Sequence, residues 1–184
     1  IFIEHLGERP LAISNIIRSV SSIPFMTVMA FASTCSSLVS NQIGAGHSKE
    51  VPALINQHIA YVLSCHSTDR TYRVVPSTVL RIYTNIPDLI TASIPTLWVL
   101  CSTYIVSIPG FIYFQSVSGT GNTRAAFILE IIALALYTIY ILIVITGLKT
   151  DVAICWTAEH LYAICIGIAS YLYIRKANWQ HKRI

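Results

Sequence analysis

LITASIPTLWVLCSTYIVSIPGFIYFQSVS, residues 89–118, is a long apolar run without one charged side chain. At about 1.5 Å of rise per residue, roughly 20 mostly apolar residues in a helix cross the hydrocarbon core of a bilayer. This run is longer than that. Pro95 and Pro109 lie inside it, and prolines are tolerated in spanning helices because neighbouring helices satisfy the freed backbone groups. The run therefore predicts a transmembrane helix.

Three further segments are also long and apolar enough to span, and each holds a single charged side chain: 11–43 with Arg18, 125–146 with Glu130, and 152–174 with Glu159. In the whole chain 54% of residues are hydrophobic and only 11% are charged, against roughly 25% charged in a soluble domain. The charges gather in short stretches between the apolar runs, so lipid is the expected solvent. The sequence predicts an all-α fold, a polytopic transmembrane helix bundle in a lipid bilayer.

A fifth segment, 51–70, is harder to interpret. It is uncharged from Val51 through Thr68 and has Pro52 in its first turn, where a helix tolerates proline. Asp69 and Arg70 then follow, and each would cost about 2.5–3.5 kcal/mol at the centre of a membrane helix. We interpret 51–70 as a span whose end carries these two side chains to the headgroups, giving about five spans. The alternative, that it does not cross, stays open.

The net charge of +4 is concentrated in the C-terminal tail, residues 175–184, which contains Arg175, Lys176, Lys182 and Arg183. Basic residues directly after a span are typical of the cytoplasmic side. We therefore expect a multi-pass protein of the cell (inner) membrane with a cytoplasmic C-terminus. Because the positive charge is confined to the tail, no nucleic-acid partner is expected.

Two polar turns with paired glycines, SNQIGAGH at 40–47 and QSVSGTGNTR at 115–124, each follow a long helix. With LAISNI at 11–16 and LRIYT at 80–84, they form an ordered set over nearly the whole chain. The set resembles the multidrug and toxic compound extrusion (MATE) transporters. The resemblance implies that residues 1–184 are a partial C-terminal lobe, with five helices of a six-helix lobe and a missing N-terminal lobe as partner.

MATE transporters have two six-helix lobes around a central cavity and export cationic or amphipathic drug-like compounds in exchange for Na⁺ or H⁺. The resemblance therefore implies an antiporter for multidrug efflux that needs no cofactor beyond the coupling ion. In some members an acidic residue of the tenth helix binds that ion, and the matching position here is Ser107. Two alternatives stay open: a lipid-linked oligosaccharide flippase of the same superfamily, and a helical membrane scaffold that transports nothing.

Polar residues inside the predicted spans are candidates for a substrate and ion pathway, since such residues are costly in lipid. They are Asn15, Arg18, Tyr104, Gln115, Glu130, Tyr137, Glu159 and His160. The carboxylates can bind a cation or proton, tyrosine rings can bind flat cations, and Arg18 can bind an anionic group. The alternative for each is a contact with the headgroups or another helix. Glu159 and His160 point about 100° apart on a helix, so one site is not expected to hold both.

No catalytic constellation, cofactor-binding motif or cluster of metal ligands is recognisable in the sequence. The glycine pairs lack the preceding strand and the following Gly-Lys-Ser/Thr of a phosphate loop. An enzyme is therefore not expected.

Cysteine labelling tests whether 51–70 crosses the membrane. If it does, Ser48 and Thr71 lie on opposite sides, because one span separates them. Single-cysteine variants at these two positions, in a cysteine-free background, are labelled from outside intact cells. We expect only the position 71 variant to react. Equal labelling of both would show that the segment does not cross.

Overall fold

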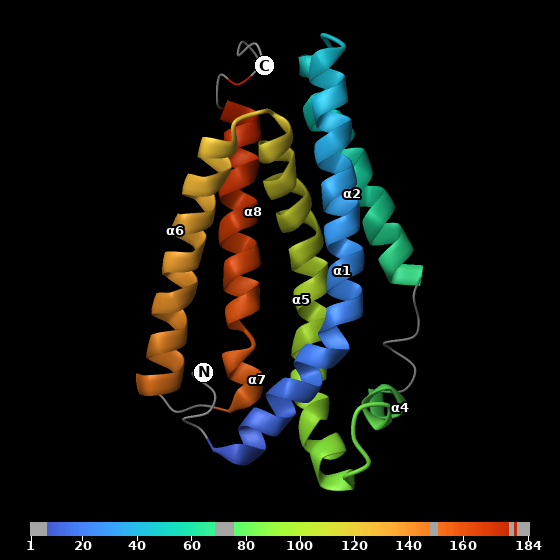
Figure 1. Cartoon of the computed structure of the whole chain (residues 1–184), viewed down its shortest axis with the longest axis vertical. Coiled ribbons are helices and arrows are strands. Elements are labelled where there is room, and N and C mark those ends of the chain that lie inside the picture. The colour runs from blue at the N-terminus through green and yellow to red at the C-terminus, as the bar shows by residue number, and fades with distance from the viewer. Residues whose placement is uncertain (1–6, 69–75, 148–150, 177–178, 180–184) are drawn as a thin grey trace.

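The computed structural model describes residues 7–68, 76–147, 151–176 and 179. This part of the chain is helical and contains no strand, which confirms the predicted all-α helix bundle (Figure 1). Asp69, Arg70 and tail residues Lys182 and Arg183 lie outside the described residues. The helical elements in chain order are α1 (Glu8–Gly44), a 3₁₀ turn (Ser48–Glu50), α2 (Val51–Thr68), α4 (Pro76–Arg81), α5 (Pro87–Gly119), α6 (Thr123–Ile141), a π-helical turn (Leu142–Gly147), α7 (Val152–Cys155) and α8 (Ala158–Lys176).

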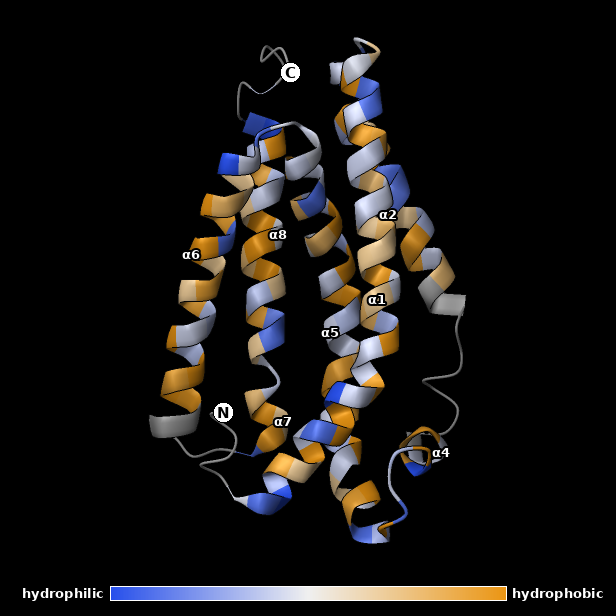
Figure 2. Ribbon diagram, in the orientation of Figure 1, coloured by the Kyte–Doolittle hydropathy of each residue, from blue (hydrophilic) through white to orange (hydrophobic). Residues whose placement is uncertain are grey.

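Four helical stretches of the described chain are long and apolar enough to cross a membrane: Glu8–Gly44, Pro87–Gly119, Thr123–Val144 and Val152–Lys176. They coincide with the four clear predicted spans. They expose many large hydrophobic side chains, and hydrophilic residues are more frequent toward the two ends of the bundle (Figure 2). The 51–70 segment forms α2, of 18 residues, which is not among the four. Whether α2 spans stays a prediction.

The last predicted span, 152–174, is interrupted rather than continuous. α7 ends at Cys155 and α8 begins at Ala158. Between them, the Thr157 hydroxyl donates to the Ile154 carbonyl oxygen at 2.6 Å and also lies 2.7 Å from the Tyr140 hydroxyl of α6. Such a local side-chain bond competes with regular helical bonding. The interruption places Glu159 in the first turn of α8 instead of deep inside a helix.

The first part of α1 leans away from the rest of the helix (Figure 1). Pro24 is the proline inside α1 and is buried. Proline lacks an N–H and its ring clashes with the preceding turn, so it bends a helix at that place. The bend carries the first turns of α1 across the end of the bundle where α7 lies.

Helix α5 is the centre of the bundle and contacts α1, α2, α4, α6, α7 and α8. Glycines let its backbone come very close to two neighbours. A Cβ added at Gly110 would lie 2.7 Å from the Ala163 carbonyl oxygen of α8, and one at Gly167 would lie 3.0 Å from the Gly110 Cα. A Cβ at Gly119 would lie 2.5 Å from the Ser36 carbonyl oxygen of α1. Small residues at helix contacts are the usual way to pack helices closely in lipid.

Gly119 and Gly44 form a matched pair for testing this packing, because each is the last residue of its helix. We expect Gly119→Ala to lower the free energy of unfolding by about 1–3 kcal/mol, since the added methyl meets backbone that cannot move aside. Gly44→Ala should change it little, because nothing lies within 4 Å of the added Cβ. Chemical unfolding in detergent micelles measures both. Equal stability of the two variants would contradict the close α1–α5 contact.

Candidate functional site

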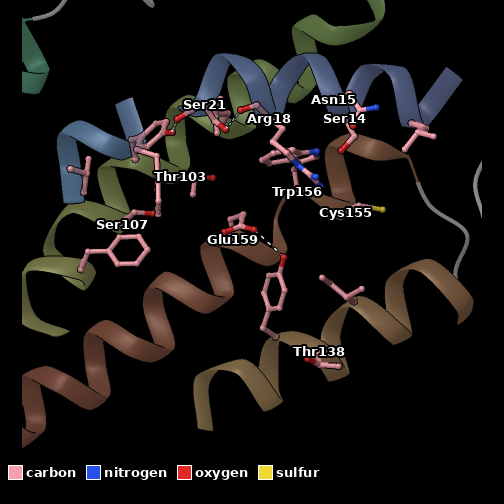
Figure 3. Close-up of a pocket in the computed structure, with 18 residues that line it drawn as sticks. Ser14, Asn15, Arg18, Ser21, Thr103, Ser107, Thr138, Cys155, Trp156 and Glu159 are labelled. Atoms are coloured by element: carbon pink, nitrogen blue, oxygen red, sulfur yellow. Dashed lines mark hydrogen bonds between the residues drawn. The ribbon is translucent and has the colours of Figure 1, made fainter. Parts of the chain in front are cut away.

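A cavity of about 600 Å³ lies where α1, α5, α6, α7 and α8 meet (Figure 3). Its volume falls within the roughly 300–1,000 Å³ of small-molecule sites. Its wall is formed by Leu11, Ser14, Asn15, Arg18, Ser21, Phe25, Val28, Leu100, Thr103, Tyr104, Ser107, Phe111, Tyr137, Thr138, Ile141, Cys155, Trp156 and Glu159. Apolar, aromatic and polar side chains are mixed, which suits an amphipathic ligand.

The wall follows helical periodicity. The α1 residues that line the cavity lie mostly three or four positions apart between Leu11 and Val28. The α5 residues that line it form a similar series between Leu100 and Phe111. Residues three and four apart share one face of a helix. The cavity is therefore bounded by one stripe of α1 and one stripe of α5, closed by the ends of α6 and α8 and by α7.

Glu159 is the carboxylate of this cavity. The Tyr137 hydroxyl donates to Glu159 Oε1 at 3.0 Å, the dashed line at Glu159 in Figure 3. Glu159 is half-buried and lies in the first turn of α8, where the helix dipole favours a negative charge. A hydrogen bond and a helix N-terminus thus hold the charge in place. Glu159 and Tyr137 are both among the candidates taken from the sequence, which does not indicate that they meet.

Arg18 and Trp156 line the same cavity. Among the described residues, the Arg18 guanidinium has no hydrogen-bond or ion-pair partner. The Trp156 indole N–H is buried and also lacks an acceptor there. Asn15 lies one turn before Arg18 and is exposed to the cavity. This side of the cavity therefore offers donors, whereas Glu159 is an acceptor.

Tyr104 reaches from α5 to the bend of α1. Its hydroxyl donates to the Ser21 carbonyl oxygen at 2.8 Å, three residues before Pro24. The N–H that Pro24 lacks is the one that would donate to the Val20 carbonyl, one residue before Ser21. The Tyr104 hydroxyl therefore bonds α1 in the turn that precedes the proline. Tyr104 thus stabilises the bent form of α1 from a position in the cavity wall.

His160 points elsewhere, as its position next to Glu159 predicts. Its ring nitrogens lie 2.9 Å from the Ser102 hydroxyl and 3.0 Å from the Thr103 hydroxyl, both on α5. Only Thr103 of these lines the cavity. His160 therefore forms an inter-helix contact between α8 and α5 and does not join Glu159.

Two other predicted residues lie outside the cavity wall. Glu130 of α6 accepts a hydrogen bond from the Tyr162 hydroxyl of α8 at 2.8 Å. Gln115 is half-buried near the far end of α5. The structure thus brings together five of the eight predicted residues: Asn15, Arg18, Tyr104, Tyr137 and Glu159.

Sequence reasoning missed several members of the wall, among them Phe25, Phe111 and Trp156. A signal was present for two of them. Phe25 lies seven residues after Arg18, and Phe111 lies seven after Tyr104, so each is on the same helix face as a predicted residue. Trp156 had no such signal, because it lies in the break between α7 and α8 that the sequence does not predict.

The family model MatE matches residues 1–144. The chain belongs to the MatE family. This confirms the resemblance read from the two glycine turns, and it makes the chain a MATE-type transporter, a multi-pass membrane protein. No curated protein and no solved structure matches the chain. In this MATE-type chain the cavity joins α1, α5 and α6, which lie within the matched residues, to α7 and α8, which follow them.

Removing the Tyr104 hydroxyl tests its contact with the bend of α1. We expect Tyr104→Phe to lower the free energy of unfolding by about 1 kcal/mol, because the hydrogen bond from α5 to the Ser21 carbonyl of α1 is lost while the ring contacts remain. Tyr61→Phe is the control, since the exposed Tyr61 hydroxyl has no hydrogen-bond partner among the described residues. Thermal unfolding in detergent compares the variants. A Tyr104→Phe protein as stable as the control would contradict the assigned bond.

Proposed function

We propose that this MATE-type transporter exports cationic or amphipathic aromatic compounds in exchange for Na⁺ or H⁺, and that the compound binds in the cavity bounded by α1 and α5. The observation that carries the proposal is Glu159, a carboxylate in the wall of a roughly drug-sized cavity. A negative charge at membrane depth needs a positive partner. An organic cation in the cavity supplies one.

Aromatic side chains support this choice of substrate. Phe25, Tyr104, Phe111 and Tyr137 line the cavity with Glu159, and the rings of Phe25 and Phe111 meet edge to face at 5.8 Å. Ring faces attract cations by about 0.5–2 kcal/mol, more when water is excluded. A flat cation can therefore stack on the rings while its charge faces the carboxylate.

Exchange follows if the coupling ion and the organic cation need the same negative charge. Na⁺ or H⁺ at Glu159 removes the charge that the compound requires, so the two do not bind together. The basic residues at the end of α8, Arg175 and Lys176, support a cytoplasmic C-terminus in the cell membrane. A second lobe facing the cavity is part of this proposal and would complete its wall.

Arg18 favours a second candidate function, the transport of an anionic lipid-linked compound. Its guanidinium has no partner among the described residues and lines the same cavity, and guanidinium groups bind phosphate and carboxylate well. A flippase for lipid-linked oligosaccharides would use Arg18 on the phosphate. The two candidates depend on opposite charges in one cavity.

Binding measurements separate them. We expect Glu159→Gln to raise the Kd for tetraphenylphosphonium at least about tenfold, because an ion-pair contribution of about 1.4 kcal/mol or more is lost. Arg18→Gln should leave this Kd unchanged or lower it. Glu50→Gln, at an exposed 3₁₀ turn, is the control. Equilibrium dialysis with the purified chain in lipid nanodiscs gives each Kd. Unchanged cation binding by Glu159→Gln, with loss of lipid pyrophosphate binding by Arg18→Gln, would favour the flippase.

A further inference from the structure

A second cavity, of about 460 Å³, lies between α4 and the first turns of α5, away from the residues of the candidate site. From α4 it is lined by Ser77 and Arg81, which are four residues apart and therefore on one face of that helix. From α5 it is lined by Ile90, Thr91 and Ile94, which share one face in the same way. We call this cavity the α4–α5 groove, because it lies between one face of a short helix and one face of a spanning helix.

The groove runs from the membrane surface toward the interior. α4 lies at the end of the bundle opposite the C-terminus and is seen nearly end-on in Figure 1, where the spanning helices run lengthwise. A helix that lies crosswise to the spans is at the level of the lipid headgroups. α5 has 33 residues, or about 50 Å, so it extends about 10 Å beyond each edge of a hydrocarbon core of about 30 Å. Pro87, its first residue, is therefore among the headgroups, and Ile94 is about 10 Å deeper, where the acyl chains begin.

Large hydrophobic side chains are exposed beside the groove, in the turn that joins α4 to α5. The exposed fraction is 76% for Ile82, 39% for Tyr83 and 55% for Ile86. Exposed hydrophobic side chains are unfavourable in bulk water and favourable against lipid, and tyrosine is enriched at the membrane–water interface. This corner of the bundle therefore contacts lipid at the headgroup level.

Leu80 fixes the position of α4. It is fully buried and packs in one hydrophobic cluster with residues of α1 and α5, among them Ile90. Its carbonyl oxygen accepts from the backbone N–H groups of Tyr83 and Thr84 at 3.0 and 3.1 Å, which closes the end of the helix. The next residue, Arg81, therefore extends into the groove from a backbone that is held in place.

The polar side chains of the groove have unused donors. Arg81 is exposed, and in the part of the chain that the structure describes its guanidinium makes no hydrogen bond or ion pair. The Ser77 hydroxyl and the side-chain amide of Asn85, which also lines the groove, have no partner there either. Asp88, at the start of α5, is already paired with Arg9 of α1 at 2.8 Å. The described lining of the groove contains no carboxylate, so its net charge is positive.

We propose that the α4–α5 groove binds an anionic glycerophospholipid, with the headgroup phosphate at Arg81 and an acyl chain along the α5 face that ends at Ile94. Guanidinium groups bind phosphate oxygens by charge-assisted hydrogen bonds, and basic pockets between spanning helices bind anionic headgroups. Ser77 and Asn85 donate to the remaining phosphate and glycerol oxygens.

The charges of the groove favour an anionic headgroup over a zwitterionic one. An ammonium group of a zwitterionic lipid needs a carboxylate, and none lines the described part of the groove. The polar end at Arg81 and the apolar end at Ile94 together match a lipid rather than a free phosphate ion, which has no apolar part. The inference does not depend on the proposed function, because it uses no residue of the candidate site.

Photo-crosslinking tests this site directly. The purified chain is placed in phosphatidylcholine nanodiscs that contain a small fraction of phosphatidylglycerol with a diazirine in its acyl chain, and mass spectrometry measures the labelling of the segment 77–94. We expect Arg81→Gln to lower this labelling about fivefold, which is the contribution of one basic residue at an anionic headgroup. Arg81→Lys keeps the charge and should stay within about twofold of the unchanged protein.

Arg124→Gln is the matched control. Arg124 is also exposed and has no side-chain partner among the described residues, but it lies at the start of α6, at the other end of the bundle. This variant should leave the labelling of 77–94 unchanged, as should an excess of soluble glycerol phosphate. Equal labelling of 77–94 in Arg81→Gln and the unchanged protein would overturn the inference. Equal labelling by a phosphatidylcholine probe, or loss of the labelling to soluble glycerol phosphate, would also overturn it, because the groove would then not select an anionic lipid.

Discussion

Inside a bilayer no water is available to bond a polar group, so each one must find a partner within the protein. Most of the hydroxyl groups here meet this constraint locally. On α1 several serines and threonines donate to carbonyls three or four residues earlier: Ser19, Ser21, Ser22, Thr27, Thr34 and Ser37. Such bonds satisfy the hydroxyl and make no demand on other helices. The polar side chains that instead form hydrogen bonds to another helix are therefore the ones that contribute to helix packing.

These cross-helix bonds come chiefly from long side chains. Tyr104, Tyr137, Tyr162 and His160 each join two helices. A serine does so where the backbones are very close, as Ser40 of α1 does with the Gly119 carbonyl oxygen of α5. Three of the four bonds, those of Tyr104, Tyr137 and His160, involve a residue of the cavity wall. Other cross-helix bonds lie away from the cavity, such as the one from Tyr113 to Asn56.

Backbone contacts of α5 determine where there is room for a cavity. Gly110 brings α5 against α8, and Gly119 brings it against α1, so these helices are held together toward the Gly119 end. The α5 residues of the cavity wall lie between Leu100 and Phe111, before the second contact. Space remains where the bend at Pro24 carries α1 away. Close packing at one end and a bent helix at the other thus produce an internal site without a long loop.

Much of this fold follows from sequence, because a spanning helix needs only length and an absence of charge. The four clear spans and the separation of Glu159 from His160 depend on local periodicity, and they agree with the structure. The bond between Tyr162 and Glu130 joins residues on different helices, so no periodic pattern reveals it. Trp156 enters the cavity through a helix break made by side-chain bonds of Thr157. Gln115 is a candidate only because it is a polar residue within a predicted span, but the α5 residues that line the cavity end at Phe111.

The cavity holds opposite charges that are not paired with each other. Arg18 and Glu159 both line it, yet the described residues contain no ion pair between them. A direct ion pair between Arg18 and Glu159 would neutralise both groups, and neither charge would then be available to bind a charged ligand. Tyr137 instead bonds one oxygen of Glu159, a neutral donor that holds the carboxylate without cancelling its charge. Because a hydroxyl stabilises a negative charge less than a guanidinium does, the carboxylate keeps its affinity for a mobile cation. The unpaired state of the two charges is thus what a reversible binding site requires.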